Sequence, residues 1–136
     1  MKTYEYNDQT YYVSARRPEE DDLGLVEIRV CKEADAPPAG ILTVLDNRHF
    51  TPAGQEVTDG FSTLLTFSEY SLPDETFSAK ELFAIAFLLL KEGGAETVTW
   101  TTSKQENAVV LEEQGFRLVN TFTGGWYPVY TYEYNF

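Results

Sequence analysis

The sequence predicts an α+β fold, an α/β sandwich, in a single domain over residues 1–136. Two features carry this prediction: a helix–strand–helix succession over residues 78–114, and short β-like segments on both sides of it. A helix between two strands indicates a parallel crossover, whereas short turns indicate antiparallel neighbours. We therefore expect a mixed, mainly antiparallel sheet of about seven strands with a central parallel pair, and two main helices.

The first third of the chain reads as two hairpins. Residues 3–6 and 10–15 are predicted strands around the turn Asn7-Asp8-Gln9. Residues 25–32 alternate between apolar and polar side chains, as a half-buried strand does, and residues 39–45 return as its antiparallel partner. The peptide TYEYN occurs at residues 3–7 and 131–135. We interpret both copies as half-exposed strands at sheet edges, which would suit a homodimer.

The middle of the chain holds the most apolar helix. Residues 46–60 read as a loop that contains His49, and residues 61–68 as a strand in which adjacent Leu64 and Leu65 indicate burial on both faces. Ser78 and Glu81 have the spacing of a capping box. A helix is therefore predicted over residues 78–92, buried nearly all round and stopped by a glycine pair.

The last third is predicted as a strand over residues 97–102, a helix over residues 104–114, and strands over residues 117–122 and 126–136. Gly115 ends the helix, and Gly124-Gly125 turns the final pair of strands. We expect Trp100 and Trp126 to pack in the core or at its rim rather than to bind substrate.

Composition narrows the classes of function. The formal net charge is −12, which repels phosphate backbones and anionic lipid, so we expect no nucleic-acid or membrane partner. A small cationic amine or a basic peptide would be attracted, and the alternative is that the charge only maintains solubility. The N-terminus is polar, and the longest apolar run, residues 82–90, is about half a membrane span. These features favour a soluble cytoplasmic protein.

The sequence has few of the residues that metal sites and catalytic triads require. Cys31 is the single cysteine and His49 the single histidine, which excludes an intrachain disulfide, a cysteine zinc cluster and a histidine-rich metal site. We interpret the acidic run at residues 19–22 as a solvated turn, and we expect no metal. A Ser-His-Asp triad would have to use His49, for which a solvent-facing position is the alternative.

The order of elements around the capped helix is similar to that of a known family. The helix 78–92 lies between predicted strands 61–68 and 97–102, and ENAVVLEEQGF (residues 106–116) with a terminal hairpin follows. This order resembles the GCN5-related N-acetyltransferase (GNAT) superfamily. YYVSARRPEEDDL (residues 11–23) is similar to its first strand and acidic helix start, and Ala39-Gly40-Ile41 to its second-strand opening.

The resemblance implies an N-acetyltransferase that uses acetyl-CoA, with its pantetheine arm beside the backbone of Thr66, Phe67 and Ser68. It implies that Phe77, Ser78 and Ala79 lie at the pyrophosphate. The family holds this group with a glycine-rich loop, whereas the matching residues 73–79 contain no glycine. Asp74, Glu75 and Glu81 are acidic, and Lys80 is the nearby cation.

The second helix also departs from the family pattern. Leu111 stands where the family often has a tyrosine that protonates the leaving thiolate, and Lys104 stands roughly at the place of an asparagine, with Asn107 close by. A transferase would need a base and an acid. The candidates are Glu69 or Glu27 as base and Tyr127 or Tyr130 as acid.

Two functions remain open from the sequence. One is a divergent acetyltransferase acting on an amine. The other is a non-catalytic protein of the same fold that has lost CoA binding. A different α+β sandwich is the structural alternative.

Overall fold

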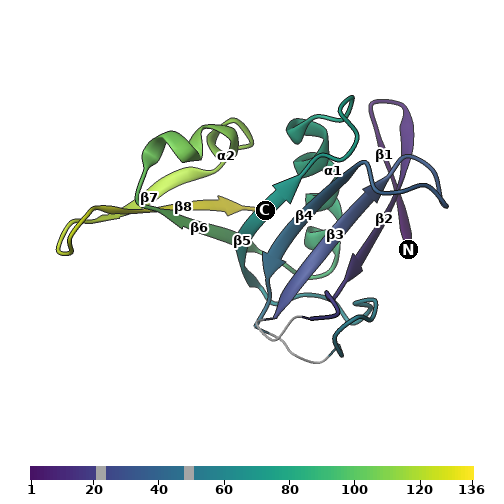
Figure 1. The fold of residues 1–136 in the computed structure, drawn as a ribbon, viewed down its shortest axis with the longest axis horizontal. Helices are drawn as coiled ribbons and strands as arrows, with labels where there is room; N and C mark the ends of the chain where they lie inside the picture. The colour runs from purple at the N-terminus through teal and green to yellow at the C-terminus, as the bar shows by residue number, and fades with distance from the viewer. Residues whose placement is uncertain (21–23, 48–50) are drawn as a thin grey trace.

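The computed structural model describes residues 1–20, 24–47 and 51–136, which form one eight-stranded mixed sheet with helices against it (Figure 1). The order across the sheet is β1-β2-β3-β4-β5-β6-β8-β7, with β5 and β6 parallel and the other neighbours antiparallel. The predicted fold class is confirmed, with one strand more than expected. The strands are β1 (Lys2–Tyr6), β2 (Gln9–Arg16), β3 (Leu25–Cys31), β4 (Gly40–Leu45), β5 (Leu64–Ser71), β6 (Thr97–Thr102), β7 (Arg117–Phe122) and β8 (Val129–Asn135); the helices are α1 (Ala79–Glu92), the 3-10 helix η1 (Gln105–Ala108) and α2 (Val109–Glu113).

The two N-terminal hairpins form as predicted. Asn7 and Asp8 both have positive φ angles, 50° and 63°, which suit the tight turn between β1 and β2. In β3 the inward positions Val26, Ile28 and Val30 are at most 2% exposed, and they lie under α1 with the matching positions of β2 and β4. The half of the sheet from β1 to β4 is thus a support for α1.

Strand β5 differs from its prediction in two ways. It begins at Leu64 rather than at residue 61, and Leu64 is 56% exposed while Leu65 is fully buried. The expectation of burial on both faces is therefore wrong. The reason is that α1 covers one face of this part of the sheet, so the side chains of β5 alternate between the core and the uncovered face.

Helix α1 forms as predicted, with Ser78 as its cap and seven buried apolar side chains. The two glycines after α1 are needed for different structural reasons. Gly94 has a φ of 104°, which favours glycine, whereas Gly93 has an ordinary φ of −80°. A Cβ on Gly93 would lie 2.4 Å from the Phe61 ring. Gly93 is therefore required by close packing of Phe61 on the end of α1.

The second helical segment is shorter than predicted. Residues 105–108 form η1, and α2 follows for five residues without a side-chain cap at either start. Short helices without side-chain caps are weakly stabilised. This explains why the predicted helix over residues 104–114 forms as a 3-10 segment followed by a short α-helix. Ala108, Leu111 and the following Phe116 are its buried apolar contacts.

The two TYEYN peptides occupy different places. Residues 3–6 belong to the edge strand β1, as expected, but residues 131–135 belong to β8, which lies between β6 and β7. The edge prediction is wrong for the second copy, because the β7–β8 hairpin folds β8 back onto β6 over six residue pairs. Strand β7 forms the edge instead.

The predicted acidic helix start after β2 is not present in the described residues. Residues 17–20 are not helical, residues 21–23 lie outside the described residues, and β3 begins at Leu25. Arg17 instead continues an extended path. Its amide donates to the Gln55 carbonyl (2.9 Å), its carbonyl accepts from the Gly54 amide (2.9 Å), and its guanidinium donates to the Thr51 carbonyl (3.0 Å).

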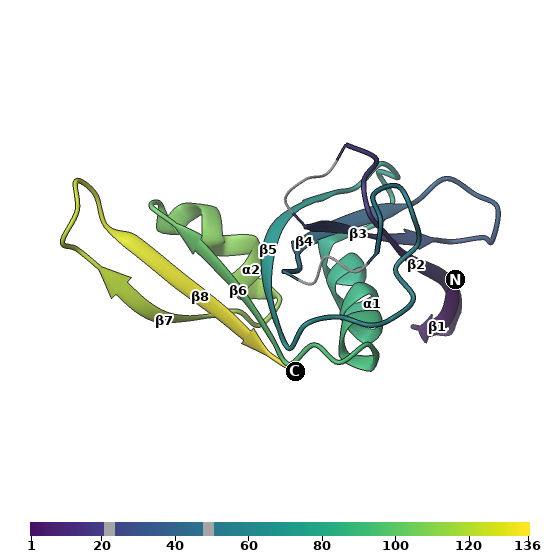
Figure 2. The ribbon, with the colours of Figure 1, turned by 90° about the horizontal axis from the view of Figure 1, so that it is seen from below.

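The sheet opens into a V between β5 and β6. Their parallel pairing is limited to three residue pairs, from Leu64↔Thr97 to Thr66↔Thr99. Beyond these pairs the strands diverge, so that β1–β5 with α1 form one arm and β6–β8 with η1 and α2 the other (Figures 1 and 2). The C-terminus lies near the closed end, and the β7–β8 connection lies at the far tip of the second arm.

The two tryptophans differ from each other. Trp100 packs against Tyr132 and Phe67, with ring centroids 6.3 Å apart in both contacts, as expected for core or rim packing. Trp126 is 102% exposed in the turn between β7 and β8, so the packing prediction is wrong for this residue. Pro128 and the glycine pair keep it outside β8, which begins only at Val129.

Candidate active site

The segment where β5 and β6 separate is the candidate site. Strand β5 continues for five residues beyond its last pair with β6, so its backbone there faces the opening rather than a strand. On its other side, pairing with β4 shifts: Thr43 is opposite Glu69, and Val44 is opposite Phe67. Ser68 is therefore the extra residue of a β-bulge. A bulge bends its strand and leaves polar backbone groups for a ligand.

Aromatic side chains pack between the two arms where β5 and β6 separate. Phe67 meets Trp100 edge-on at 6.3 Å, and its ring also lies 6.5 Å from Phe116 and 5.6 Å from Phe83. These contacts connect β5, α1 and the second arm. Packed rings therefore bridge the two arms, while the backbone of β5 beyond Thr66 has no partner on β6.

The start of α1 lies next to the end of β5, and its polar groups already have partners. The Ser78 hydroxyl accepts from the Glu81 amide (3.1 Å), and the Ser78 amide donates to the Glu81 carboxylate (3.3 Å). Tyr11 also donates weakly to this carboxylate (3.4 Å) and more closely to Gln9 (2.8 Å). Burial and Glu81 together raise the pKa of Tyr11.

The loop before α1 is held by an acidic side chain. Asp74 accepts from the amide (2.9 Å) and hydroxyl (2.7 Å) of Thr76 and forms an ion pair with Lys32 (2.8 Å). The hydrogen bond from Lys32 and those from Thr76 lower the pKa of Asp74 to about 2. Asp74 is therefore ionised at physiological pH, and its charge is paired with that of Lys32.

These contacts do not fit the diphosphate of CoA. Anion sites at helix starts use free backbone amides and the positive end of the helix dipole. Here a carboxylate takes that position: Glu81 binds the cap amide, and Asp74, which is paired with Lys32, and Glu75 precede the helix in sequence. Phe77 is 3% exposed, Ser78 serves as the cap, and Ala79 is half-buried. The helix start therefore does not fit the phosphates of CoA.

The candidate bases lie on the face of the sheet opposite α1. The register places Glu27 opposite Thr43 and Thr43 opposite Glu69, so that the two carboxylates flank one threonine on adjacent strands. All three line a hollow of about 400 Å³ that also includes Ile41 and Ser71. Arg29 donates to Glu27 at 3.4 Å. The sequence named Glu27 and Glu69 separately, and only the register shows that they share a hollow.

The candidate acids lie on the other arm. Tyr127 is 64% exposed in the β7–β8 connection, and Tyr130 is half-buried on β8 opposite Thr102. The connection lies at the outer tip of the V in both ribbon views, whereas β5 lies at its centre (Figures 1 and 2). The structure therefore does not bring Tyr127 close to Glu69.

The second helix offers no replacement acid. Leu111 is 3% exposed and packs in the core, while Lys104 and Asn107 are exposed. His49 lies outside the described residues. Within the described ranges, no three His, Cys, Asp or Glu side chains are placed to hold a metal ion together. No helix there is long and apolar enough to cross a membrane.

Comparison with solved structures identifies the architecture. An acetyltransferase from Bacillus subtilis, crystallised with CoA, has a TM-score of 0.54 at 13% identity, and the match covers 93% of this chain and 99% of that one. The chain has the GNAT fold. A probable GNAT-family acetyltransferase from Chromobacterium violaceum also matches at a TM-score of 0.54 and 14% identity, over 86% of this chain and 59% of that one.

A third GNAT-fold structure carries a specific substrate in its name. Ribosomal-protein-alanine N-acetyltransferase from Brucella melitensis matches with a TM-score of 0.51 at 15% identity, over 83% of this chain and 70% of that one. This chain thus spans nearly all of the Bacillus protein but less than two thirds of the Chromobacterium protein. No family model matches the sequence, and no curated protein matches it.

Proposed function

We propose that this chain is a divergent acyl-CoA N-acyltransferase-like protein that binds the acyl-thioester arm of its donor where β5 and β6 separate and acylates a small cationic amine. One observation carries the proposal: the parallel pair separates after three residue pairs, beside a bulge at Ser68. A bound acyl-CoA would supply the activated acyl group. The backbone of Thr66, Phe67 and Ser68 would hold its arm.

The amine would be attracted by the carboxylates of the hollow on the uncovered face. Glu69 follows the bulge directly, and Glu27 lies two strands away beside the same threonine. The net charge of −12 raises the local concentration of cations around the whole molecule. Glu69 is the proposed base because it is the carboxylate nearest along the strand to the β5 backbone that would hold the arm. Tyr127 and Tyr130 stay candidate acids.

The test compares two acyl donors that have the same pantetheine thioester. Acetyl-CoA and S-acetylpantetheine carry the same thioester, but the second lacks the nucleotide and its diphosphate. We expect both to raise the melting temperature, with similar dissociation constants, because the helix start gives the diphosphate no favourable contact. Ligand at about 100 times its dissociation constant adds roughly 2.7 kcal/mol, which a thermal melt resolves. Absence of a shift with both ligands at millimolar concentration would overturn the proposal.

A second candidate function is favoured by the capping contacts at Ser78. A non-catalytic protein could keep this fold for binding while its helix start loses the capacity to hold CoA. In that case neither donor shifts the melt, and a panel of amines or basic peptides still does. Loss of acyl transfer in Glu69→Gln with unchanged donor binding would instead support the transferase.

A further inference from the structure

Strand β7 leaves one edge of the sheet open. It pairs with β8 on one side, and all six of its residues are exposed. In Figure 2 no helix or strand lies beyond it. An open edge presents a row of backbone donors and acceptors that another strand can complete.

Apolar side chains surround this edge. Nine large hydrophobic residues are exposed in the described part of the chain, and five of them lie within ten residues of sequence. We refer to these five together with β7 as the β7 edge surface: Leu118 (44% exposed), Val119 (48%), Phe122 (58%), Trp126 (102%) and Tyr127 (64%). Such a concentration is unusual for a surface that only meets water.

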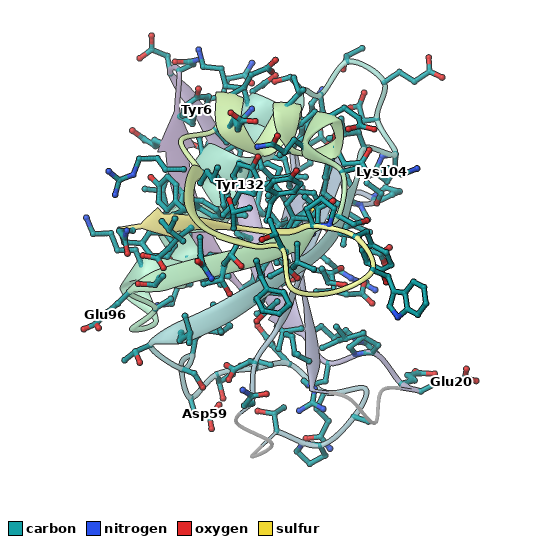
Figure 3. All side chains as sticks on the ribbon, turned by 90° about the vertical axis from the view of Figure 1, so that its left-hand side faces the viewer. Tyr6, Glu20, Asp59, Glu96, Lys104 and Tyr132 are labelled. Carbon is teal, nitrogen blue, oxygen red and sulfur yellow. The ribbon has the colours of Figure 1, made fainter. Side chains whose placement is uncertain are left out.

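Carboxylates are few around this surface, and Glu133 of β8, which lies opposite Arg117, offsets its charge. The chain has 22 Asp and Glu residues, yet none falls between residues 114 and 132, where Arg117 is the one charged side chain. Figure 3 looks onto the β7–β8 connection and shows Glu20, Asp59 and Glu96 around the periphery of the view. Two molecules of charge −12 repel each other almost everywhere, so this surface is where they can meet at least cost. A basic partner would prefer the acidic surfaces instead.

We infer that the β7 edge surface binds a second copy of this chain by antiparallel pairing of the two β7 strands. The bulge at residue 119 decides the register. Arg117 and Phe122 oppose Glu133 and Val129 of β8, so they lie on one face, whereas Leu118 and Thr121 oppose Tyr132 and Tyr130 on the other. A two-fold axis through the sheet must pair residues of the same face.

We choose the register that meets this condition and pairs Arg117 of each copy with Phe122 of the other, and Leu118 with Thr121. The guanidinium then lies against an aromatic ring, a favourable cation–π arrangement. Leu118 and Phe122 project from opposite faces of the sheet, so pairing of the two β7 edges buries the backbone edge and only the flanks of these side chains. Such a contact is smaller than a specific interface of standard size, so the dimer is expected to dissociate on dilution.

The experiment measures molar mass by chromatography with light scattering over a series of protein concentrations. The unaltered chain is expected to reach twice its 15.4 kDa at high concentration. Phe122→Lys places two cations opposite each other and should raise the dimer dissociation constant about 30-fold or more. Phe122→Glu removes the same ring but faces Arg117, so it should weaken the dimer much less.

Two further variants complete the test. The double change Arg117→Glu with Phe122→Lys exchanges the charges and should restore dimerisation relative to Phe122→Lys alone. Leu64→Glu, at an equally exposed position on β5, is the matched control and should leave the mass unchanged. A monomer at every concentration would overturn the inference, and so would equal weakening by Phe122→Lys and Phe122→Glu.

Discussion

Ser78 and Glu81 bind each other in both directions at the start of α1, side chain to amide and amide to side chain. This reciprocal contact stabilises the helix and occupies the backbone amide that an anion bound at the helix start would need. Helix stability and the proposed binding of CoA would therefore compete for the same backbone groups. The predictions below separate these two effects.

Replacing the cap should weaken the protein without affecting its core. Ser78→Ala removes the acceptor for the Glu81 amide and is expected to lower the free energy of unfolding by about 1 kcal/mol. Urea unfolding measures this difference. Ser103→Ala, at an exposed serine outside the helices, is the control and should change the free energy by less than about 0.5 kcal/mol. Equal effects of the two changes would contradict the role assigned to the cap.

Removing negative charge in front of α1 should improve binding of phosphate-bearing ligands. Asp74→Asn combined with Glu75→Gln is expected to lower the dissociation constant of CoA about three- to tenfold, since exposed charges each contribute a fraction of a kcal/mol. Titration at low salt measures it. S-acetylpantetheine is the control ligand, because it lacks the phosphates and should bind the variant and the parent equally.

The Asp74 ion pair predicts a specific acid dependence. The folded-state pKa of about 2 lies below the ordinary 3.8, so the protein binds this proton less readily than the unfolded chain does. The contribution to stability is therefore present above pH 3.8 and is lost as the pH falls through about 2. Asp74→Asn should reduce the pH dependence of the free energy of unfolding between pH 3.8 and about 2. Lys32→Gln removes the largest cause of the lowered Asp74 pKa and should reduce this pH dependence in part. High salt should make the effects of both substitutions smaller.

Close packing at the end of α1 predicts a cost for the smallest substitution. Gly93→Ala places a methyl group against the Phe61 ring and should destabilise the protein by about 1–3 kcal/mol. Thermal unfolding measures this loss. Adding Phe61→Leu should recover part of it by making room. Gly125→Ala has no neighbouring heavy atom closer than 3.9 Å and should be neutral.

Local patterns predicted the elements well because each depends on neighbours in sequence. The Ser78–Glu81 spacing located the start of α1, and alternation located β3 within one residue. The wrong predictions concern contacts between segments that are far apart in the sequence. Nothing within residues 131–135 indicates that they lie between β6 and β7, and adjacent leucines could not show that one face of β5 is left uncovered.

The candidate site was predicted in part for the same reason. The helix start and its acidic residues are visible in the sequence, but the partner of Asp74 is Lys32, from a distant segment. The shared hollow of Glu27 and Glu69 depends on two strand registers and a bulge. The exposure of Trp126 depends on where β8 begins, which the aromatic-rich sequence of residues 126–136 does not indicate.

The position of β8 has a consequence for synthesis on the ribosome. Strand β6 and strand β7 are both made earlier, yet each has β8 as its antiparallel neighbour, so the second arm cannot assemble until residues 129–135 have left the exit tunnel. During that interval β6 and the aromatic rings destined to cover α1 stay open to other nascent chains. Stalling or truncation within this stretch should therefore release a species that chaperones retain, whereas the first arm can already be complete.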